Sequence, residues 1–539
     1  RIFHRDSEGR LTGISREGVT MGITVNDNGC ITSITMPDGG VYEYRYDDMQ
    51  NLAEVKNPMG NSKTFSYDDK HRMNAWYDEN GNRVVQNLYD NENRVIRQTD
   101  RLGGTITLSY GQGKTSAKDA AGNLTVYEYD GNYRTTRITY PDGTKETKEY
   151  KEGRMTGTVD RTGVATSFVY NADGNITKKT RGNVVTSFSY DGNGNLLSTT
   201  DAMGNTVTAT YDAAGNLIKI TEADGTERRF SYDSRNRLKG ETDGNGNHTS
   251  YSYTGNYLTK ITLNGTVTAS YAYNMMGQPI KVTDGNGNTT LYTYDSLGRN
   301  TSVTSPEGGR TSIVYGKTGL VLSVSGPMGE KRIYTYDKAG NITSVTDGMG
   351  SRYEYAYDKN SNRISERDPY GNVRKVSFDA MDRPVKAVDA GGNSWYYEYD
   401  GNDRLVKMTN PLGSESVITY DPYTGQALSI RDYEGIETVY SYNRVGALTG
   451  ISRGGELAEA YEYDEKRQVI KTTYAGGLVQ EREYDRNGNC ILVRERGGDS
   501  ASAEEGEYDE DGSSERGEDA GNERITRYIY DDHNRLIKE

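Results

Sequence analysis

Short runs of alternating apolar and polar residues fill this chain, and turn residues separate them. Residues 336–356 show the pattern: 342–346 is rich in β-branched residues, and 352–357 alternates aromatic and polar side chains. Turn signals at 338–341 and 347–350 flank the first run, and the second run follows the second turn. A period of two is typical of a half-buried strand, and glycine or asparagine suits a tight turn. Each unit is therefore predicted to contain two strands, each followed by a turn. Neighbouring strands should be antiparallel, because the connections are too short for a crossover.

A Tyr-Asp pair returns about every 21 residues almost from end to end. A fixed period of this size indicates one supersecondary unit that is copied many times and stacked. The sequence thus predicts a single array over residues 1–539, with about 25 units and about 50 strands. The residues that we assign to the structural repeat motif are Tyr46, Asp47, Tyr67, Asp68, Tyr190, Asp191, Tyr211, Asp212, Gly215, Asn216, Tyr232, Asp233, Tyr294, Asp295, Tyr336, Asp337, Gly340, Asn341, Tyr357, Asp358, Tyr399, Asp400, Tyr463, Asp464, Tyr484 and Asp485.

The predicted fold is all-β, with repetitive antiparallel β-hairpins that form a spiralling, hollow, barrel-like β-sheet shell. Only 33% of the residues are hydrophobic, which suits a single sheet with a modest apolar layer better than a wide two-sided core. Long open sheets twist and curl, so a ribbon of about 50 strands must wind on itself. We expect no helix longer than two turns, because no long stretch keeps a helical period.

Charge and cysteine content exclude several function classes. The net charge is −14, from 78 acidic and 64 basic residues, which disfavours a nucleic-acid partner. Cys30 and Cys490 are the two cysteines, so a disulfide framework is not expected. No run of 18 apolar residues occurs, and we predict no membrane span. The chain starts and stops in mid-pattern, and we interpret it as a piece of a longer protein.

The sequence offers few groups for catalysis or metal binding. The Asp-Gly-Asn-Gly-Asn turns that begin at Asp191, Asp243 and Asp284 resemble the start of a calcium loop, but position twelve is never the expected glutamate. Turn chemistry explains these residues better than calcium does. The four histidines, His4, His71, His248 and His533, are scattered without metal-ligand spacing. We therefore predict no catalytic, cofactor-binding or metal-binding residue. We also predict that the protein is not an enzyme.

Two features break the uniformity of the array. Residues 497–521 contain ten acidic residues and one arginine. We interpret this segment as a solvated, low-complexity insertion within the array, and its residues 499–519 as the most mobile part; an acidic surface for a basic partner is the alternative. Exposed tyrosines, Trp76 and Trp395 could stack on sugars, although in a tyrosine-rich sheet most rings form the apolar layer.

The motif Tyr-Asp-x-x-Gly-Asn, as at 211–216 and 336–341, resembles that of the YD-repeat or Rhs-repeat family. The resemblance covers essentially the whole chain. The family includes bacterial Rhs polymorphic toxins, Tc toxin cocoon subunits, wall-associated proteins of Gram-positive bacteria and animal teneurins. It implies a spiralling β-sheet shell around a cavity, which in the bacterial toxins holds a C-terminal toxic polypeptide.

The chain departs from the family where the shells are closed off. That region contains the motif Asp-Pro-x-Gly-Leu, whereas this chain has only Asp368-Pro369-Tyr370-Gly371 and Asp421-Pro422-Tyr423-Thr424-Gly425. Both lack the leucine and lie within ordinary repeats. The autoproteolysis that belongs to the motif is therefore assigned to no residue here.

The leading hypothesis is a structural shell section of a secreted or surface bacterial Rhs-like protein. It would enclose and protect a C-terminal toxin or effector cargo, which is the expected partner. The alternative is a cell-surface adhesion or carbohydrate-binding scaffold, with glycans as partners. An enzyme is a distant third, because a repeat gives no reason to expect a convergent acid–base cluster.

Overall fold

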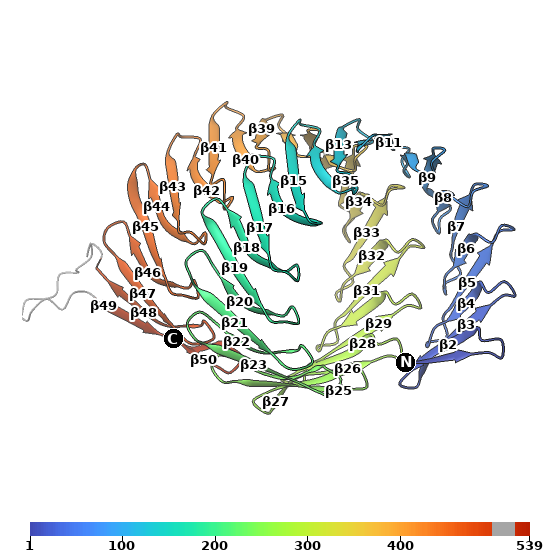
Figure 1. The fold of residues 1–539 in the computed structure, drawn as a ribbon, viewed down its shortest axis with the longest axis horizontal. Coiled ribbons are helices and arrows are strands. Elements are labelled where there is room, and N and C mark those ends of the chain that lie inside the picture. Colours follow the sequence, from blue (N-terminus) through green and yellow to red (C-terminus); the bar gives the residue numbers. More distant parts are fainter. Residues whose placement is uncertain (498–522) are drawn as a thin grey trace, which may run out of the picture. The chain divides into compact units, whose positions relative to one another are not determined.

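The chain folds as β-strands joined by turns, as Figure 1 shows. The computed structural model describes residues 1–497 and 523–539, and these residues contain 51 strands and no helix. Most strands are five to seven residues long. The predicted all-β fold is therefore confirmed. Residues 498–522, which include nearly all of the acidic segment, lie outside the described part, so the predictions for them stay predictions.

The strands follow one another along the whole chain. In order they are β1 (Ile2–Arg5), β2 (Leu11–Arg16), β3 (Val19–Val25), β4 (Ile31–Thr35), β5 (Val41–Tyr46), β6 (Leu52–Lys56), β7 (Ser62–Tyr67), β8 (Met73–Tyr77), β9 (Arg83–Tyr89), β10 (Val95–Thr99), β11 (Thr105–Gly111), β12 (Lys114–Lys118), β13 (Leu124–Tyr129), β14 (Thr135–Thr139), β15 (Lys145–Lys151), β16 (Arg154–Val159), β17 (Ala165–Tyr170), β18 (Ile176–Arg181), β19 (Val184–Tyr190), β20 (Leu196–Thr200), β21 (Thr206–Tyr211), β22 (Leu217–Thr221), β23 (Glu227–Tyr232), β24 (Leu238–Thr242), β25 (His248–Thr254) and β26 (Tyr257–Leu263). They continue as β27 (Thr266–Tyr273), β28 (Pro279–Asp284), β29 (Thr289–Tyr294), β30 (Asn300–Thr304), β31 (Arg310–Tyr315), β32 (Val321–Ser325), β33 (Lys331–Tyr336), β34 (Ile342–Thr346), β35 (Arg352–Tyr357), β36 (Arg363–Arg367), β37 (Val373–Phe378), β38 (Pro384–Val388), β39 (Ser394–Tyr399), β40 (Leu405–Thr409), β41 (Glu415–Tyr420), β42 (Ala427–Arg431), β43 (Glu437–Tyr442), β44 (Leu448–Arg453), β45 (Glu456–Tyr463), β46 (Val469–Tyr474), β47 (Val479–Tyr484), β48 (Cys490–Arg496), β49 (Glu523–Arg527), β50 (Ile529–Tyr530) and β51 (Leu536–Lys538).

Strands β1 to β49 form one 49-stranded sheet, and β50 and β51 form a separate pair. Neighbouring strands are consecutive in sequence and antiparallel, as where β33 pairs with β34 and β34 pairs with β35. The prediction of repetitive antiparallel hairpins is thus confirmed. Each repeat contains two turns. We call the turn that follows Tyr-Asp, or its degenerate copy, the YD turn, and the other the return turn. Because strand direction alternates, all YD turns lie at one edge of the ribbon and all return turns at the other.

Most of the turns share one backbone geometry, which the sequence spacing imposes. In the YD turn, the Asp337 N–H donates to the Asn341 carbonyl at 2.9 Å, and the Gly340 N–H donates to the Asp337 carbonyl at 3.2 Å. Gly340 has a φ of 92°, a value that glycine adopts without steric cost. A β-bulge lies at Thr335/Tyr336 and recurs at the corresponding place in most repeats. The bulge ends the ladder at the tyrosine, so that the aspartate opens the turn.

The sheet is thin, and small polar side chains are its most buried groups. Among the described residues, only Ile23 and Ala75 are buried hydrophobic ones. Ser344 retains 1% of its exposed area, and its hydroxyl hydrogen-bonds the Thr335 hydroxyl on the paired strand at 2.6 Å. Ser302 occupies the same position two repeats earlier and bonds Thr293 at 2.7 Å. Cross-strand hydroxyl pairs therefore occupy positions where a two-layered protein would place leucine.

The contacts divide the chain into two compact units. Unit 1 comprises residues 1–145, 252–261 and 267–396, and unit 2 comprises residues 146–251, 262–266 and 397–539. Each unit therefore contains an early pass of the ribbon and a late pass that returns more than 200 residues later. In unit 2, strands β15 to β20 of the early pass run beside β40 to β45 of the late pass (Figure 1). No helix long and apolar enough to cross a membrane occurs in residues 1–497 and 523–539.

Candidate functional site

The repeat tyrosines stand at the ends of strands, and most of their hydroxyls bond to the preceding strand. The Tyr336 hydroxyl donates to the Val321 carbonyl at 2.7 Å, and the Tyr357 hydroxyl donates to the Ile342 carbonyl at 2.8 Å. The acceptor lies fifteen residues before the tyrosine. Among the assigned motif residues, Tyr46, Tyr211, Tyr232, Tyr294, Tyr463 and Tyr484 make the same bond. The hydroxyls of Tyr67 and Tyr190 make none in the part of the chain that the structure describes. Such a bond contributes about 1 kcal/mol and orients the ring.

The repeat aspartates close the YD turns. Asp212 Oδ1 accepts the backbone N–H groups of Ala214 and Asn216 at 2.9 and 2.8 Å, and Oδ2 accepts the Asn216 amide at 2.9 Å. The Asn216 side chain, as the largest cause, lowers the pKa of Asp212 below its usual value. The backbone bond to the residue four positions on recurs at Asp47, Asp68, Asp191, Asp233, Asp295, Asp337, Asp358, Asp400, Asp464 and Asp485.

Arginine often replaces the asparagine at the end of the YD turn and then connects two repeats. Arg404 Nε donates to Asp400 Oδ2 at 2.7 Å, and its guanidinium lies 4.7 Å from the centre of the Tyr420 ring in the next repeat. Arg72 and Arg299 cover Tyr89 and Tyr315 in the same way, also at 4.7 Å. Stacking of this kind adds about 0.5–1 kcal/mol per pair at an exposed site. Sequence analysis missed these arginines, although their spacing from the Tyr-Asp pair was visible.

In both units, the early pass meets the late pass through unlike turns. Return turns of the early pass contact YD turns of the late pass, and we call this line of contacts the seam. In unit 1, the Asn360 amide donates to Asp119 Oδ2 at 2.9 Å, and Arg299 Nη2 approaches Met59 Sδ at 3.1 Å. In unit 2, the contacts join residues about 240 positions apart in the same manner. This offset is close to eleven and a half repeats, and the half repeat is required because the two edges carry different turns.

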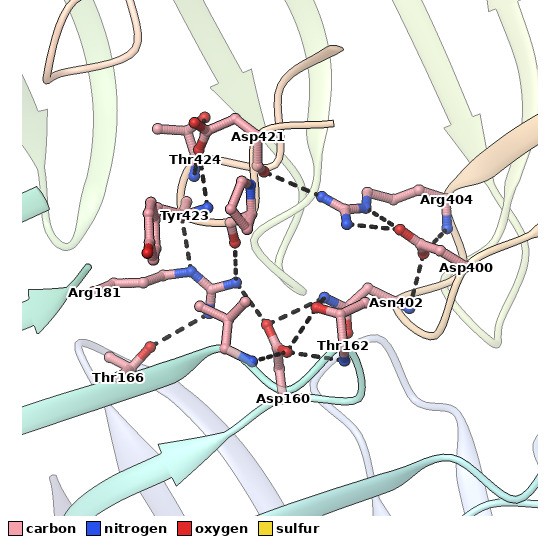
Figure 2. A network of polar contacts seen from close by, with 12 residues as sticks. Asp160, Thr162, Thr166, Arg181, Asp400, Asn402, Arg404, Asp421, Tyr423 and Thr424 are labelled. Atoms are coloured by element: carbon pink, nitrogen blue, oxygen red, sulfur yellow. Dashed lines mark hydrogen bonds and ion pairs between the residues drawn. The ribbon is translucent and has the colours of Figure 1, made fainter. Parts of the chain in front are cut away.

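Figure 2 shows a part of the seam in unit 2, around Asp160 and Arg181. Asp160 begins one return turn of the early pass, and Arg181 ends β18 directly before the next return turn. Arg181 Nη2 lies 2.6 Å from Asp160 Oδ2 and 3.0 Å from the Pro422 carbonyl, and Arg181 Nε donates to the Tyr423 carbonyl at 2.8 Å. The Asn402 amide, also on the late pass, reaches Asp160 Oδ2 at 3.1 Å. One guanidinium and one carboxylate thus join two YD turns to two return turns.

The Asp160 carboxylate is ionised and saturated with donors in this network. Burial alone raises its pKa, but hydrogen bonds from the Val164 N–H and from the side chains of Arg181, Thr162 and Asn402 lower that pKa to about 2. Charged hydrogen bonds of this kind are roughly twice as strong as neutral ones. The network therefore stabilises the seam at neutral pH.

Glycine permits the backbones to approach at the seam. A Cβ atom at Gly401 would lie 2.6 Å from the carbonyl oxygen of Arg161, and one at Gly244 would lie 2.7 Å from that of Arg486. Neither glycine has a positive φ, so close approach and not turn geometry explains the residue. Sequence analysis could not distinguish these glycines from the many turn glycines.

A second cluster in unit 2 joins Asp243 of the early pass to Asp485 of the late pass. The Asn245 amide donates to Asp485 Oδ2 at 2.9 Å, and the Asn487 amide donates to Asp243 Oδ2 at 2.7 Å. Each aspartate also accepts backbone N–H groups of its own turn. The two bonds are reciprocal, and the amide donors offset the repulsion between the two carboxylates.

In the turns that were considered for calcium, one oxygen of each carboxylate binds the backbone of the same turn. Asp191, Asp243 and Asp284 each accept two backbone N–H groups through Oδ1. No group of three or more His, Cys, Asp or Glu side chains with metal-binding geometry lies within the described ranges. Cys30 and Cys490 are free thiols, and Trp76 packs against Phe65 with ring centres 6.2 Å apart.

The comparisons with known proteins agree with this architecture. The RHS Repeat model matches residues 190–227, 211–248, 273–310, 317–348, 336–373 and 377–415. The chain therefore contains RHS repeats in these stretches. Most of the matched stretches begin near a repeat tyrosine, and 377–415 begins near Phe378, the degenerate copy. No curated protein matches the sequence.

Solved structures resemble the fold of this RHS array at low sequence identity. The crystal structure of TcdB2-TccC3-TEV is 12% identical, with a TM-score of 0.55 over 92% of this chain and 40% of that chain. TcdB2-TccC3 without its hypervariable C-terminal region is 14% identical, with a TM-score of 0.57 over 88% of this chain and 31% of that chain. TcdB2-TccC3 itself is 13% identical, with a TM-score of 0.54 over 96% of this chain and 35% of that chain. The RHS array thus spans 31–40% of the solved chains, and the likeness shows a shared fold.

Proposed function

We propose that this RHS array is a section of a wall that encloses and protects a polypeptide cargo. The observation that carries the proposal is the seam. A ribbon with no contacts between its two edges would leave gaps between its passes. Arg181 and Asn402 instead join adjacent passes within unit 2, and Asn360 does so within unit 1, so that each unit has a broader surface than one pass alone.

The mechanism would be steric and would need no bond chemistry. The charged side chains of the seam and of the turns bind one another and the backbone, as Asp160 and Asp400 do, so their role in the fold already explains their positions. A wall of this kind isolates a marginally stable polypeptide from proteases. The fold likeness to the TcdB2-TccC3 structures supports a structural role rather than catalysis.

The partner and the location follow from the same proposal. We infer that the cargo is a C-terminal toxin or effector of the same bacterial protein, and that the protein is secreted or displayed at the cell surface. The resemblance to RHS toxins supports this inference, together with the net charge of −14, which favours solubility. Binding of surface glycans by the outside of the wall is the second candidate.

A protection assay tests the proposal. A small, marginally stable reporter domain is fused after Glu539, and its digestion by a protease is compared with that of the free reporter. We expect slower digestion in the fusion. The double variant Arg181→Gln, Asn402→Ala should restore fast digestion because it removes the contacts of the Figure 2 network.

The matched control is Arg137→Gln. Arg137 is an exposed residue of β14 and pairs with Glu128 of β13 at 3.1 Å. This variant should protect the reporter as well as the unmodified array does. Equal digestion of the free and the fused reporter would refute the enclosing role, whereas protection that survives the double variant would refute the role of the seam.

A further inference from the structure

The seam of unit 2 contains an asparagine that is followed directly by a glycine. Asn487 and Gly488 are the third and fourth residues of the YD turn at 485–489 on the late pass. In most sequences, the side chain of the residue after an asparagine hinders attack of its backbone nitrogen on the asparagine amide carbon, and glycine has no such side chain. An Asn-Gly pair is therefore the asparagine context in which the side-chain amide is lost most readily.

The loss of this amide needs only water and the chain itself. The Gly488 nitrogen forms a bond to Cγ of Asn487, the Cγ–Nδ2 bond breaks, and the proton of the Gly488 nitrogen leaves with Nδ2 as ammonia. Water then adds to one carbonyl of the five-membered imide and breaks one of its two ring C–N bonds. The product is aspartate or isoaspartate, depending on which bond breaks. Either product replaces an amide that donates hydrogen bonds by a carboxylate that only accepts them.

The amide of Asn487 is fully used in the seam. Its Nδ2 donates to Asp243 Oδ2 on the early pass at 2.7 Å and to Asn534 Oδ1 at 3.1 Å. Its Oδ1 accepts the backbone N–H of Asn245 on the early pass at 3.2 Å. A carboxylate at position 487 would face the Asp243 carboxylate with no donor between them. The two like charges would repel each other at this short distance, and Asp243 would lose a partner.

Asn193 is a chemically matched residue outside the seam. It is also the third residue of a YD turn in unit 2, at 191–195, and it is also followed by a glycine. In both turns, the glycine N–H donates to the carbonyl of the opening aspartate at 3.1 Å. The side chain of Asn193 is exposed and makes no hydrogen bond within the described residues, whereas Asn487 is half-buried. The two sites thus share their turn and differ in what holds the amide.

We propose that Asn487-Gly488 is a modification site that acts as a one-way latch in the seam of unit 2. While the seam is closed, Asp243 and Asn534 hold the amide and restrict the rotation that attack by the Gly488 nitrogen requires. When the seam opens, the amide reacts as freely as that of Asn193. The carboxylate that results prevents the seam from closing again at this point. The inference goes beyond the proposed wall, because it does not depend on a cargo.

Rates of amide loss test the protection. The whole chain is incubated in mildly alkaline buffer, and peptide mass spectrometry follows positions 487 and 193 over time. We expect Asn487 to react at least about tenfold more slowly than Asn193, because its hydrogen bonds must break first. The double variant Lys466→Ala, Arg467→Ala removes the neighbouring seam contacts with Asp224 and Asp201. It should raise the rate at Asn487 towards that at Asn193 and leave Asn193 unchanged.

Substitution by aspartate tests the effect of the product on the seam. Asn487→Asp should accelerate hydrogen exchange in the turn at 243–247 by about tenfold or more, and the matched control Asn193→Asp should leave it within about threefold. Asn487→Ala removes the bonds without adding a charge and should have a smaller effect than Asn487→Asp.

Three results would overturn the proposal. The first is an equal rate of amide loss at Asn487 and Asn193 in the parent chain. The second is a rate at Asn487 that does not change in the double variant. The third, which does not depend on how the double variant folds, is equal acceleration of exchange at 243–247 by Asn487→Asp and Asn193→Asp.

Discussion

The same return turn occurs in two surroundings within unit 1. Met59 and Leu102 lie in return turns of the early pass and are 48% and 45% exposed. Met328 and Met349 lie at the equivalent position in return turns of the late pass and are 96% and 94% exposed. The local sequences are nearly alike, with Asn-Pro-Met-Gly around Met59 and Gly-Pro-Met-Gly around Met328.

The difference arises from residues far away in sequence. The early turns are covered by YD turns of the late pass; Arg299 reaches Met59, and Arg101, next to Leu102, donates to the Lys338 carbonyl at 3.3 Å. The late turns have no such cover in the part of the chain that the structure describes. The repeat therefore determines the conformation of a turn, and the opposite edge of the ribbon determines its burial. The following changes test this separation, from the largest expected effect to the smallest.

Removing half a repeat should disrupt the seam far more than removing a whole one. Deletion of residues 342–362 removes one repeat, so YD turns still meet return turns. Deletion of residues 342–351 removes a single strand and its turn and exchanges the two edges for all later repeats. We expect soluble, folded protein from the first deletion and loss of native hydrogen-exchange protection from the second. Equal behaviour of the two would contradict the rule of unlike edges.

Tyr336→Ala should destabilise its own repeats by about 2–3 kcal/mol, since it removes a large, half-buried ring and its bond to the Val321 carbonyl. Tyr336→Phe removes only the hydroxyl bond and should cost about 1 kcal/mol. Because repeat arrays couple mainly to neighbours, local hydrogen exchange should accelerate near β32 to β35 and stay unchanged in distant repeats. Uniform acceleration along the chain would show that the repeats are not the cooperative units.

Arg181→Gln should loosen the seam of unit 2 without altering the repeats themselves. The change removes the ion pair with Asp160 and the bonds to the Pro422 and Tyr423 carbonyls, for a cost of about 1–3 kcal/mol. Hydrogen exchange should accelerate in the turns at 160–164 and 421–425. Arg137→Gln, at an exposed position of β14, should cost less than about 0.5 kcal/mol. A larger loss of stability in Arg137→Gln than in Arg181→Gln would show that the seam contributes little to stability.

Acid should weaken the Figure 2 network below pH 4. The folded pKa of Asp160 is about 2, below the unfolded value of about 3.9. A depressed carboxyl pKa stabilises the fold at a pH above the unfolded value, and this contribution, at most about 2 kcal/mol, is lost as the pH falls towards 2. Comparison with Asp160→Asn isolates the effect from other aspartates, such as Asp68 and Asp233, whose pKa values are also about 2. A variant with the same pH dependence as the parent would exclude Asp160 as the cause.

Lysine at the two methionine positions gives the smallest expected effect. Met59→Lys places a cation beside Arg299 and should cost about 0.5–1 kcal/mol, whereas Met349→Lys enters solvent and should stay within about 0.5 kcal/mol of the parent. Denaturant midpoints measure both. Equal midpoints would mean that cover by the late pass has no energetic consequence.

The sequence by itself determined the repeat and its turns. Period-two alternation predicts strands, and the interval from one Tyr-Asp pair to the next places the turns. The chemistry of aspartate and glycine explains turns such as 337–341, because the groups that interact there lie within five residues of one another. The hydrogen bond of the Tyr336 hydroxyl is also local, because its acceptor lies in the same hairpin. Arg404 over Tyr420 follows the same spacing but was missed, because the sequence does not show which way an arginine turns.

Only the tertiary structure decided which turns meet. Asp160 is hydrogen-bonded to Asn402, and Asp243 to Asn487, and each pair is separated by more than 240 residues in sequence. Each strand adds a small twist and bend to the ribbon, and a change of a few degrees per strand accumulates over more than twenty strands into a shift of whole repeats. The sequence therefore specifies that unlike edges meet, whereas the accumulated curvature selects the offset of about eleven and a half repeats and, with it, the residues that form the seam.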